Sequence, residues 1–194
     1  MKKIAITGGI GSGKSTVSKW ISEAGYPVFS CDAIYAETVN EPAYIETLSK
    51  VFPTAVVDGK IDKKRLASIV FSDKEARDRL HAIAHPLVMQ RLDEQMSDCQ
   101  ANSVFAEVPL LYEGGFEKRF DEIIVVIRER SARLQTVCER DTLDIREATA
   151  RMSAQYDYDK DERGVLKKSN VRILVNDNDL SALKKKVLKI LEDI

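Results

Sequence analysis

Short apolar runs alternate with amphipathic stretches along the chain. Residues 3–7 form an apolar run typical of a buried strand, and residues 8–13 follow with four glycines. From Lys14 the apolar positions recur at helical spacing, at Val17, Trp20, Ile21 and Ala24. Gly25 suits the end of that helix, and residues 27–29 then read as a second strand. This order predicts a βαβ unit with parallel strands and a right-handed crossover.

Residues 33–99 differ in character, because helical periodicity dominates with breaks near Pro53 and at residues 58–59. Residues 72–75, Ser-Asp-Lys-Glu, match a capping box and predict a helix that runs to about residue 83. His85-Pro86 is expected to interrupt it. A further amphipathic helix is predicted from Leu87 or Val88, Leu92, Met96 and Cys99. We interpret the segment as a helical, substrate-side insert between two strands of the main sheet.

The second half of the chain returns to strands. Residues 103–111, 122–127 and 171–175 are predicted strands, and Ser131 is predicted to cap a helix that holds Leu134, Val137 and Cys138. Residues 144–164 are highly charged and favour either a solvated helix pair or a mobile flap. The closing helix has an apolar face formed by Leu180, Leu183, Val187 and Leu191. The pattern predicts an α/β fold, a mostly parallel sheet flanked by helices.

Composition narrows the function classes. The chain has 194 residues and a formal net charge of -1, which argues against a general nucleic-acid binder. Its longest aliphatic run, residues 123–127, is far shorter than the roughly 20 residues of a membrane span. The apolar start breaks at residues 8–9, so it does not form a signal peptide. The three cysteines, Cys31, Cys99 and Cys138, are widely spaced and typical of a reduced cytoplasm. We therefore expect a cytoplasmic protein without a nucleic-acid or membrane partner, and the sequence implies no obligate protein partner.

Residues 8–16, Gly-Gly-Ile-Gly-Ser-Gly-Lys-Ser-Thr, fit the phosphate-loop pattern GxxxxGK[ST]. Glycines allow a backbone whose successive N–H groups point at phosphate oxygens, and the following helix adds its positive end. Lys14 can reach the β- and γ-phosphates, and the Ser15 hydroxyl can bind Mg²⁺. The predicted ATP-binding residues are Gly9, Ile10, Gly11, Ser12, Gly13, Lys14, Ser15 and Thr16.

Other nucleotide-binding classes fit less well. A dinucleotide fold needs GxGxxG at a spacing that these glycines do not have. A GTPase would need NKxD, whereas the nearest string, Asn-Asp-Asn-Asp at residues 176–179, lacks the lysine. The small size and the helical insert after the second predicted strand favour a small-molecule kinase.

Three acidic residues lie within or just after the predicted strands. Asp32 follows the second strand, where a carboxylate can accept a hydroxyl proton as the phosphoryl group arrives, or can cap the next helix. Glu107 lies within an apolar run and needs a partner; holding Mg²⁺ through a water would supply one. Glu113, further on, either binds substrate or is simply exposed.

Arg140 precedes Asp141 at the end of a predicted helix, before the charged segment. A lid that carries it would bring positive charge to the transferred phosphoryl group, whereas a surface pair with Asp141 is the simpler interpretation. Other candidates for the lid role are Arg133, Arg146 and Arg151. His85 is interpreted as a substrate contact or a structural residue rather than as the general base.

The chain resembles the dephospho-coenzyme A kinases from residue 3 to about residue 155. The resemblance rests on the order and spacing of several strings: the phosphate loop with Thr7, GKID at 59–62 with Arg65-Leu66, VFSD at 70–73, IAHP at 83–86, EVPLLYE at 107–113, and Arg140-Asp141 followed by Arg151-Met152 and Gln155. Three departures stand out. Ser30-Cys31-Asp32 replaces the family's DAD, Glu107 replaces an aspartate, and Asn170 replaces an acid.

The resemblance implies a P-loop kinase that transfers the γ-phosphoryl of ATP, with Mg²⁺, to the ribose 3′-hydroxyl of dephospho-CoA, the last step of CoA synthesis. It implies a nucleotide-binding core (1–32, 100–130 and 165–194), a helical CoA domain (33–99) and a lid (131–164). Asp32 would be the base, while Lys14 and Arg140 would stabilise the transferring phosphoryl group. Thr7 would lie near the phosphates, and the acceptor would contact His85, Leu111, Tyr112 and Glu113. The alternatives are another alcohol or nucleoside monophosphate as acceptor, or a nucleotide-gated binding module.

Overall fold

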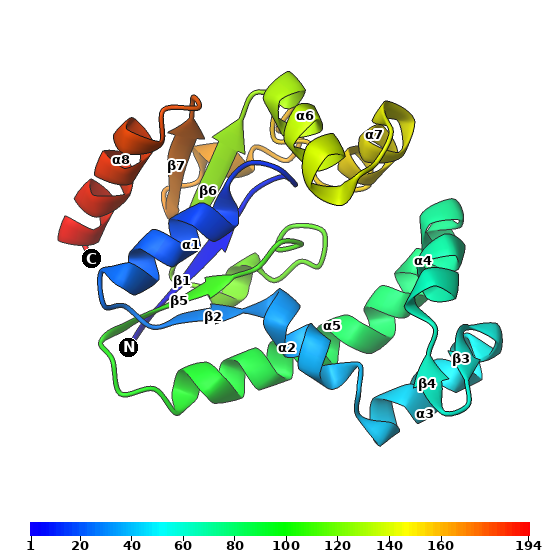
Figure 1. Cartoon of the computed structure of the whole chain (residues 1–194). Coiled ribbons are helices and arrows are strands. Elements are labelled where there is room, and N and C mark those ends of the chain that lie inside the picture. Colours follow the sequence, from blue (N-terminus) through cyan, green and yellow to red (C-terminus); the bar gives the residue numbers. More distant parts are fainter. The chain divides into compact units, whose positions relative to one another are not determined.

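The apolar runs assemble into a five-stranded sheet with the order β2-β5-β1-β6-β7 (Figure 1). The computed structural model describes residues 1–194. The strands are β1 (Lys2–Thr7), β2 (Val28–Ser30), β5 (Ser103–Glu107), β6 (Glu122–Arg128) and β7 (Val171–Asn176). β1 pairs in parallel with both β5 and β6, and β6 pairs in parallel with β7. This confirms the predicted mostly parallel α/β sheet.

The chain divides into two compact units, Met1–Phe29 with Cys99–Ile194, and Ser30–Asp98. The first unit holds the sheet with the helices α1 (Lys14–Glu23), α6 (Arg130–Asp141), α7 (Ile145–Ser153) and α8 (Leu180–Glu192) and the short turns η2 (Glu117–Arg119) and η3 (Val165–Lys167). Residues 131–164 belong to this same unit. α1 and α8 lie side by side against the sheet (Figure 1). Their apolar faces, with Val17, Ile21, Leu183 and Val187, close the core over Ile6 and Ile124.

The predicted strand at residues 103–111 is shorter in the structure, because β5 ends at Glu107. Pro109 lacks the N–H that a ladder needs, and the chain turns there instead. The Gly114 N–H then binds the Leu110 carbonyl at 3.0 Å. The turn leaves Glu107 at the carboxyl end of a buried strand.

The second unit is helical apart from one small hairpin. Its elements are α2 (Cys31–Thr38), α3 (Pro42–Val51), η1 (Pro53–Ala55), β3 (Val56–Val57), β4 (Lys60–Ile61), α4 (Lys63–Ser72) and α5 (Lys74–Ser97). Asp58 and Gly59 join β3 to β4, both with positive φ (50° and 70°), as a two-residue hairpin turn requires. An apolar cluster that includes Leu48, Leu66 and Ala76 holds the unit together.

The predicted interruption at His85-Pro86 is wrong, because α5 continues through Pro86 for 24 residues. Buried side chains on both sides of Pro86, including Ala84, Val88 and Leu92, pack the helix along its length. That packing outweighs the lost backbone hydrogen bond.

The predicted helix caps also need correction. Asp73 rather than Ser72 caps α5, with its carboxylate accepting the Glu75 N–H at 2.8 Å, while Ser72 ends α4. Glu129 rather than Ser131 caps α6 through the Ala132 N–H at 3.0 Å. In both cases a carboxylate, which also interacts favourably with the positive end of the helix, takes the place of a hydroxyl.

The highly charged region 144–164 forms one helix rather than a helix pair. α7 begins with a capping box, in which Asp144 and Glu147 bind each other's backbone N–H groups. After Ser153 the chain forms turns up to η3.

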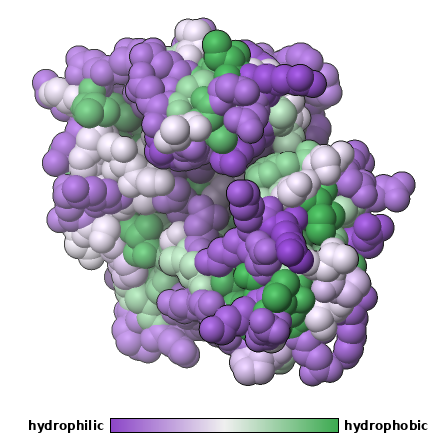
Figure 2. Space-filling model, turned by 45° about the vertical axis from the view of Figure 1, so that its right-hand side comes forward, coloured by the Kyte–Doolittle hydropathy of each residue, from purple (hydrophilic) through white to green (hydrophobic).

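The visible face of the molecule is mostly polar, with small separate apolar patches (Figure 2). Exposed apolar side chains such as Phe71 and Ile145 are scattered, as is normal for a protein surface. None of the helices has the length and apolar composition needed to cross a membrane.

We predict that Pro86→Ala raises the free energy of unfolding by about 1–3 kcal/mol, because alanine restores a helix-interior donor. Pro42→Ala is the matched control, since Pro42 is the first residue of α3, where no N–H is needed. Urea unfolding followed by circular dichroism measures both. An equal gain at the two positions, or no gain at residue 86, would contradict the explanation given for α5.

Candidate nucleotide-binding and catalytic site

A glycine-rich loop connects the carboxyl end of β1 to the first turn of α1. Gly8, Gly11 and Gly13 have φ values of 142°, 77° and 103°, which side-chain-bearing residues rarely adopt. A Cβ on Gly8 would lie 2.1 Å from the Val126 carbonyl oxygen. The glycines therefore provide both the backbone conformation and the room that the loop needs.

Lys14 holds the first half of this loop. Its ammonium donates to the carbonyls of Gly8 and Gly9 at 2.8 and 3.1 Å, and its side chain is buried. A buried ammonium beside the loop provides positive charge for an anion, and both carbonyls are turned toward the lysine.

Two side chains from neighbouring strands hold the second half of the loop. Arg128, the last residue of β6, donates to the Gly11 carbonyl at 3.1 Å. Asn176, the last residue of β7, donates to the Ser12 carbonyl at 2.8 Å and is buried. With these carbonyls bound, the loop N–H groups other than those of Ile10 and Ser12, which already have acceptors, are left to bind an anion.

Ser15 and Glu107 meet at the start of α1. The Ser15 hydroxyl donates to the Glu107 carboxylate at 2.9 Å. Glu107 is only 8% exposed. A buried carboxylate beside a hydroxyl offers two oxygen ligands that suit Mg²⁺, which prefers oxygen and keeps several of its waters.

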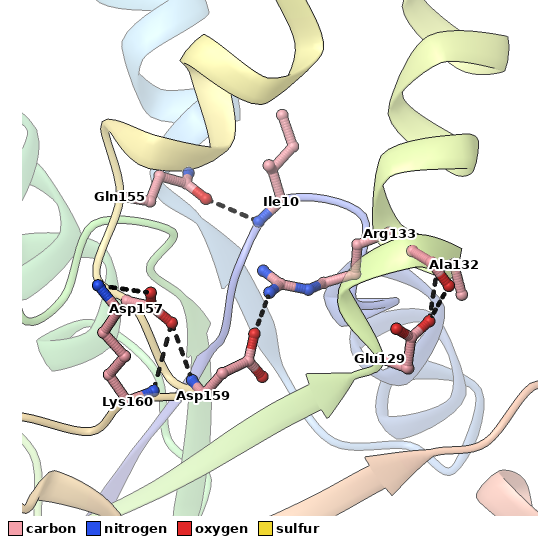
Figure 3. Close-up of polar contacts among 9 residues, drawn as sticks. Ile10, Glu129, Ala132, Arg133, Gln155, Asp157, Asp159 and Lys160 are labelled. Carbon is pink, nitrogen blue, oxygen red and sulfur yellow. Dashed lines mark hydrogen bonds and ion pairs between the residues drawn. The ribbon is translucent and has the colours of Figure 1, made fainter. Parts of the chain in front are cut away.

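Arg133, on the first turn of α6, packs against the loop from outside. Its guanidinium donates to Asp159 at 3.0 Å, and a Cβ on Gly9 would lie 2.2 Å from its Nη1 (Figure 3). Its Nε is buried without a hydrogen-bond partner. In this structure Arg133 therefore supports the loop, rather than extending from an exposed flap.

The segment after α7 binds the core near the phosphate loop. The Gln155 side-chain oxygen accepts the Ile10 N–H at 2.7 Å (Figure 3). Tyr158 is buried and its hydroxyl lies 3.3 Å from the Thr7 hydroxyl. These contacts attach residues 155–158 to the end of β1 and to the loop.

The residues after β5 form a second attachment point. Glu113 accepts the Tyr156 N–H at 2.7 Å, and Arg163 donates to the Tyr112 carbonyl at 2.6 Å. Glu113 is exposed as a residue, but partial burial of its carboxyl raises the pKa of that group. The hydrogen bond from the Tyr156 N–H and the positive charge of Lys14 act in the opposite direction and lower the pKa. Leu111 and Tyr112 have buried side chains, and the Tyr112 hydroxyl lacks a hydrogen-bond partner.

Arg140 lies near the end of α6 and forms a two-point ion pair with Asp141, with N···O distances of 2.7 and 2.9 Å. Arg151 of α7 binds the same carboxylate at 3.2 Å. The two arginines lower the pKa of Asp141. Asp141 therefore keeps the guanidinium groups of Arg140 and Arg151 close together. Arg146, another candidate for the lid role, is exposed on α7.

Two predicted site residues belong to the second unit. Asp32 is an exposed residue of the first turn of α2, and Ser30 caps this helix through the Ala33 N–H at 3.3 Å. Capping is therefore the role of Ser30 rather than of Asp32. His85 stacks on His81 with ring centroids 4.4 Å apart, and burial together with His81 lowers its pKa to about 4. Its imidazole is neutral at pH 7.

Sequence reasoning identified the loop but assigned no role to four residues that shape it, namely Arg128, Gln155, Tyr158 and Asn176. Arg128 and Asn176 are polar residues that each end an apolar strand, which is a signal available in the sequence. Gln155 enters only as part of the family resemblance, and Tyr158 lies in irregular chain without a comparable signal.

The chain matches the family model described as dephospho-CoA kinase over residues 2–182. A dephospho-CoA kinase of Thermus thermophilus is 42% identical over 152 residues, covering 78% of this chain and 74% of the relative. One of Fusobacterium nucleatum is 35% identical over 193 residues, covering 98% and 97%. The crystal structure of TT1252 from Thermus thermophilus superposes with a TM-score of 0.83 at 37% identity, covering 100% of this chain and 97% of that one.

We predict that Gly8→Ala destabilises the protein more than Gly25→Ala does. Gly25 also has a positive φ (93°), but no atom lies within 4 Å of a Cβ built there. Gly25→Ala should cost about 1–2 kcal/mol of backbone strain, and Gly8→Ala about 1–3 kcal/mol more, because its Cβ would clash with β6. Thermal unfolding measures both, and ATP titration should show a loss at residue 8 alone. Equal effects would remove the steric argument for Gly8.

Proposed function

The chain belongs to the dephospho-CoA kinase family, and we propose that it transfers the γ-phosphoryl of ATP to the ribose 3′-hydroxyl of dephospho-CoA, giving CoA and ADP. The observation that carries this proposal is the family match over residues 2–182, together with a phosphate loop whose carbonyls are bound by Lys14, Arg128 and Asn176.

The triphosphate of ATP binds along the loop from Gly9 to Thr16. Free loop N–H groups and the amino end of α1 face the phosphates, and both carry partial positive charge. Lys14 lies beside the loop and moves from the carbonyls of Gly8 and Gly9 to the phosphate oxygens. Exchanging two neutral acceptors for an anionic one strengthens its hydrogen bonds.

Mg²⁺ suits the pair formed by Ser15 and Glu107, since both offer oxygen and lie within hydrogen-bond distance of each other. Ser15 would bind the ion directly, and Glu107 would hold it through a water. The bound ion would neutralise charge on the phosphates. Few protein ligands are typical of Mg²⁺ in kinases, where the phosphates and waters complete the octahedron.

Asp32 is proposed to accept the proton of the acceptor hydroxyl. It follows the last residue of β2 by two positions, and β2 belongs to the same sheet as β1, whose carboxyl end leads into the loop. The capping role that would compete for this carboxylate belongs to Ser30. A general base in this position typically accelerates the reaction by about 10²–10⁴-fold.

Arg140 is proposed to bring positive charge to the transferring phosphoryl group, and Arg151 accompanies it because Asp141 binds both. The helices α6 and α7 form the core of the proposed lid, residues 131–164. Gln155, Tyr156 and Tyr158 are bound to Ile10, Glu113 and Thr7 of the core. We therefore propose that the moving part of the lid lies before residue 155.

The acceptor is proposed to contact Thr7, His85, Leu111, Tyr112 and Glu113. Support for Thr7 and Glu113 comes from their positions next to the phosphate loop and beside Lys14. His85 is neutral and can donate or accept one hydrogen bond. Leu111 and Tyr112 have buried side chains, so their part is to shape the wall of the site, and the family resemblance alone assigns them to the acceptor.

We also propose that the enzyme works in the cytoplasm with ATP and dephospho-CoA as its partners, without nucleic acid, membrane or an obligate protein partner. None of the three cysteines forms a disulfide, as a reducing compartment favours.

We expect the protein, incubated with Mg-ATP and a panel of alcohols and nucleoside monophosphates, to add one phosphate to dephospho-CoA. Mass spectrometry of the acceptors measures it. Phosphorylation of a different acceptor with dephospho-CoA untouched would reject the proposed substrate. ATP binding without any phosphorylated acceptor would instead favour a nucleotide-gated binding module.

We expect Asp32→Asn to keep the affinity for ATP but to slow turnover by about 10²–10⁴, the loss typical of removing a general base. Glu37→Gln is the matched control, because Glu37 is another exposed acid on α2. Steady-state kinetics and calorimetric titration with ATP separate the two effects. Unchanged turnover in Asp32→Asn would remove Asp32 from the mechanism.

A further inference from the structure

Gln155 differs from the other side chains that bind the phosphate loop, because it accepts a hydrogen bond from a loop N–H group. Its side-chain oxygen accepts the Ile10 N–H at 2.7 Å, across 145 residues of sequence (Figure 3). Lys14, Arg128 and Asn176 all bind loop carbonyls. Gln155 thus takes up the Ile10 N–H and holds the loop tip in place, while N–H groups elsewhere in the loop remain for phosphate.

Two attachments fix the position of Gln155 itself. On one side, its backbone N–H binds the Met152 carbonyl at 3.2 Å, which joins it to the end of α7. On the other side, the next residue, Tyr156, is held by Glu113 at 2.7 Å. The side chain is therefore presented to Ile10 by a short stretch that is anchored at both ends.

A glutamine suits this position for an electrostatic reason. Its side-chain oxygen accepts the Ile10 N–H without bringing a negative charge to the tip of a loop that binds a triphosphate. A glutamate would make the same hydrogen bond, in a stronger form, but would repel the phosphates.

We propose that Gln155 is a positioning residue that preforms the tip of the phosphate loop before ATP binds. This proposal depends on the proposed function in one respect only, namely that the loop binds ATP. A loop containing four glycines loses much conformational freedom on binding, and a contact that orders it beforehand lowers that loss. Because Gln155 lies two positions after the last residue of α7 and its N–H binds the Met152 carbonyl, it also joins the order of the loop tip to the position of that helix.

Three variants test this proposal. Gln155→Met removes the acceptor but keeps the length of the side chain, and Gln155→Glu keeps an acceptor but adds charge. Gln135→Met is the matched control, because Gln135 is exposed on α6 and binds only the side chain of Glu139. The readouts are hydrogen exchange of the Ile10 amide in the nucleotide-free protein and the affinity for ATP by calorimetry.

Gln155→Met should speed exchange at Ile10 and weaken ATP binding by about 2- to 10-fold, the loss that one neutral hydrogen bond carries. Gln155→Glu should leave Ile10 protected yet weaken ATP binding, by a factor that shrinks as salt is raised. Gln135→Met should match the wild type in both measurements.

Unchanged exchange at Ile10 in Gln155→Met would overturn the proposal, as would weaker ATP binding without any change at Ile10. If Gln155→Met fails to fold, Gln155→Glu decides, since faster exchange at Ile10 in that variant would equally overturn it. Neither readout involves an acceptor, so failure here is distinguishable from an error in the proposed substrate.

Discussion

The direction of the carbonyl groups in the phosphate loop is the constraint on which the site depends. A loop binds an anion through N–H groups only if its carbonyl oxygens face elsewhere, because each oxygen carries partial negative charge. Here Arg128 and Asn176 take up the carbonyls of Gly11 and Ser12, and Lys14 takes up those of Gly8 and Gly9 before its proposed move to the phosphates. The partners come from α1 and from the ends of β6 and β7, so the order of the strands in the sheet fixes the shape of the loop.

The elements of the fold were predictable where apolar residues repeat at a clear period. Strands and amphipathic helices follow directly from such repeats, and the predicted sheet is present. Two kinds of error arose from competition between local signals and packing. Pro86 is a helix breaker in isolation, yet buried residues on both sides keep α5 continuous. The caps at Asp73 and Glu129 lie one or two residues away from the predicted Ser72 and Ser131, because a nearby carboxylate competes for the same N–H groups.

The candidate site was predictable to the extent that it is local in sequence. The glycine spacing and Lys14-Ser15 carry their chemistry within nine residues, and Glu107 is conspicuous as an acid in an apolar run. The supports around the loop are not local. Gln155 lies 145 residues from Ile10, and Asn176 lies 164 residues from Ser12. Only the folded chain brings these pairs together, and no periodicity marks them.

The bond between Asn176 and the Ser12 carbonyl has a consequence for synthesis of the chain in the cell. The glycines leave the ribosome before β7 does, because Asn176 follows Ser12 by 164 residues. A nascent chain therefore lacks this support of its nucleotide site until β7 has been translated. Nucleotide then stabilises chains that contain β7 in preference to shorter ones, because a ligand favours the state that binds it.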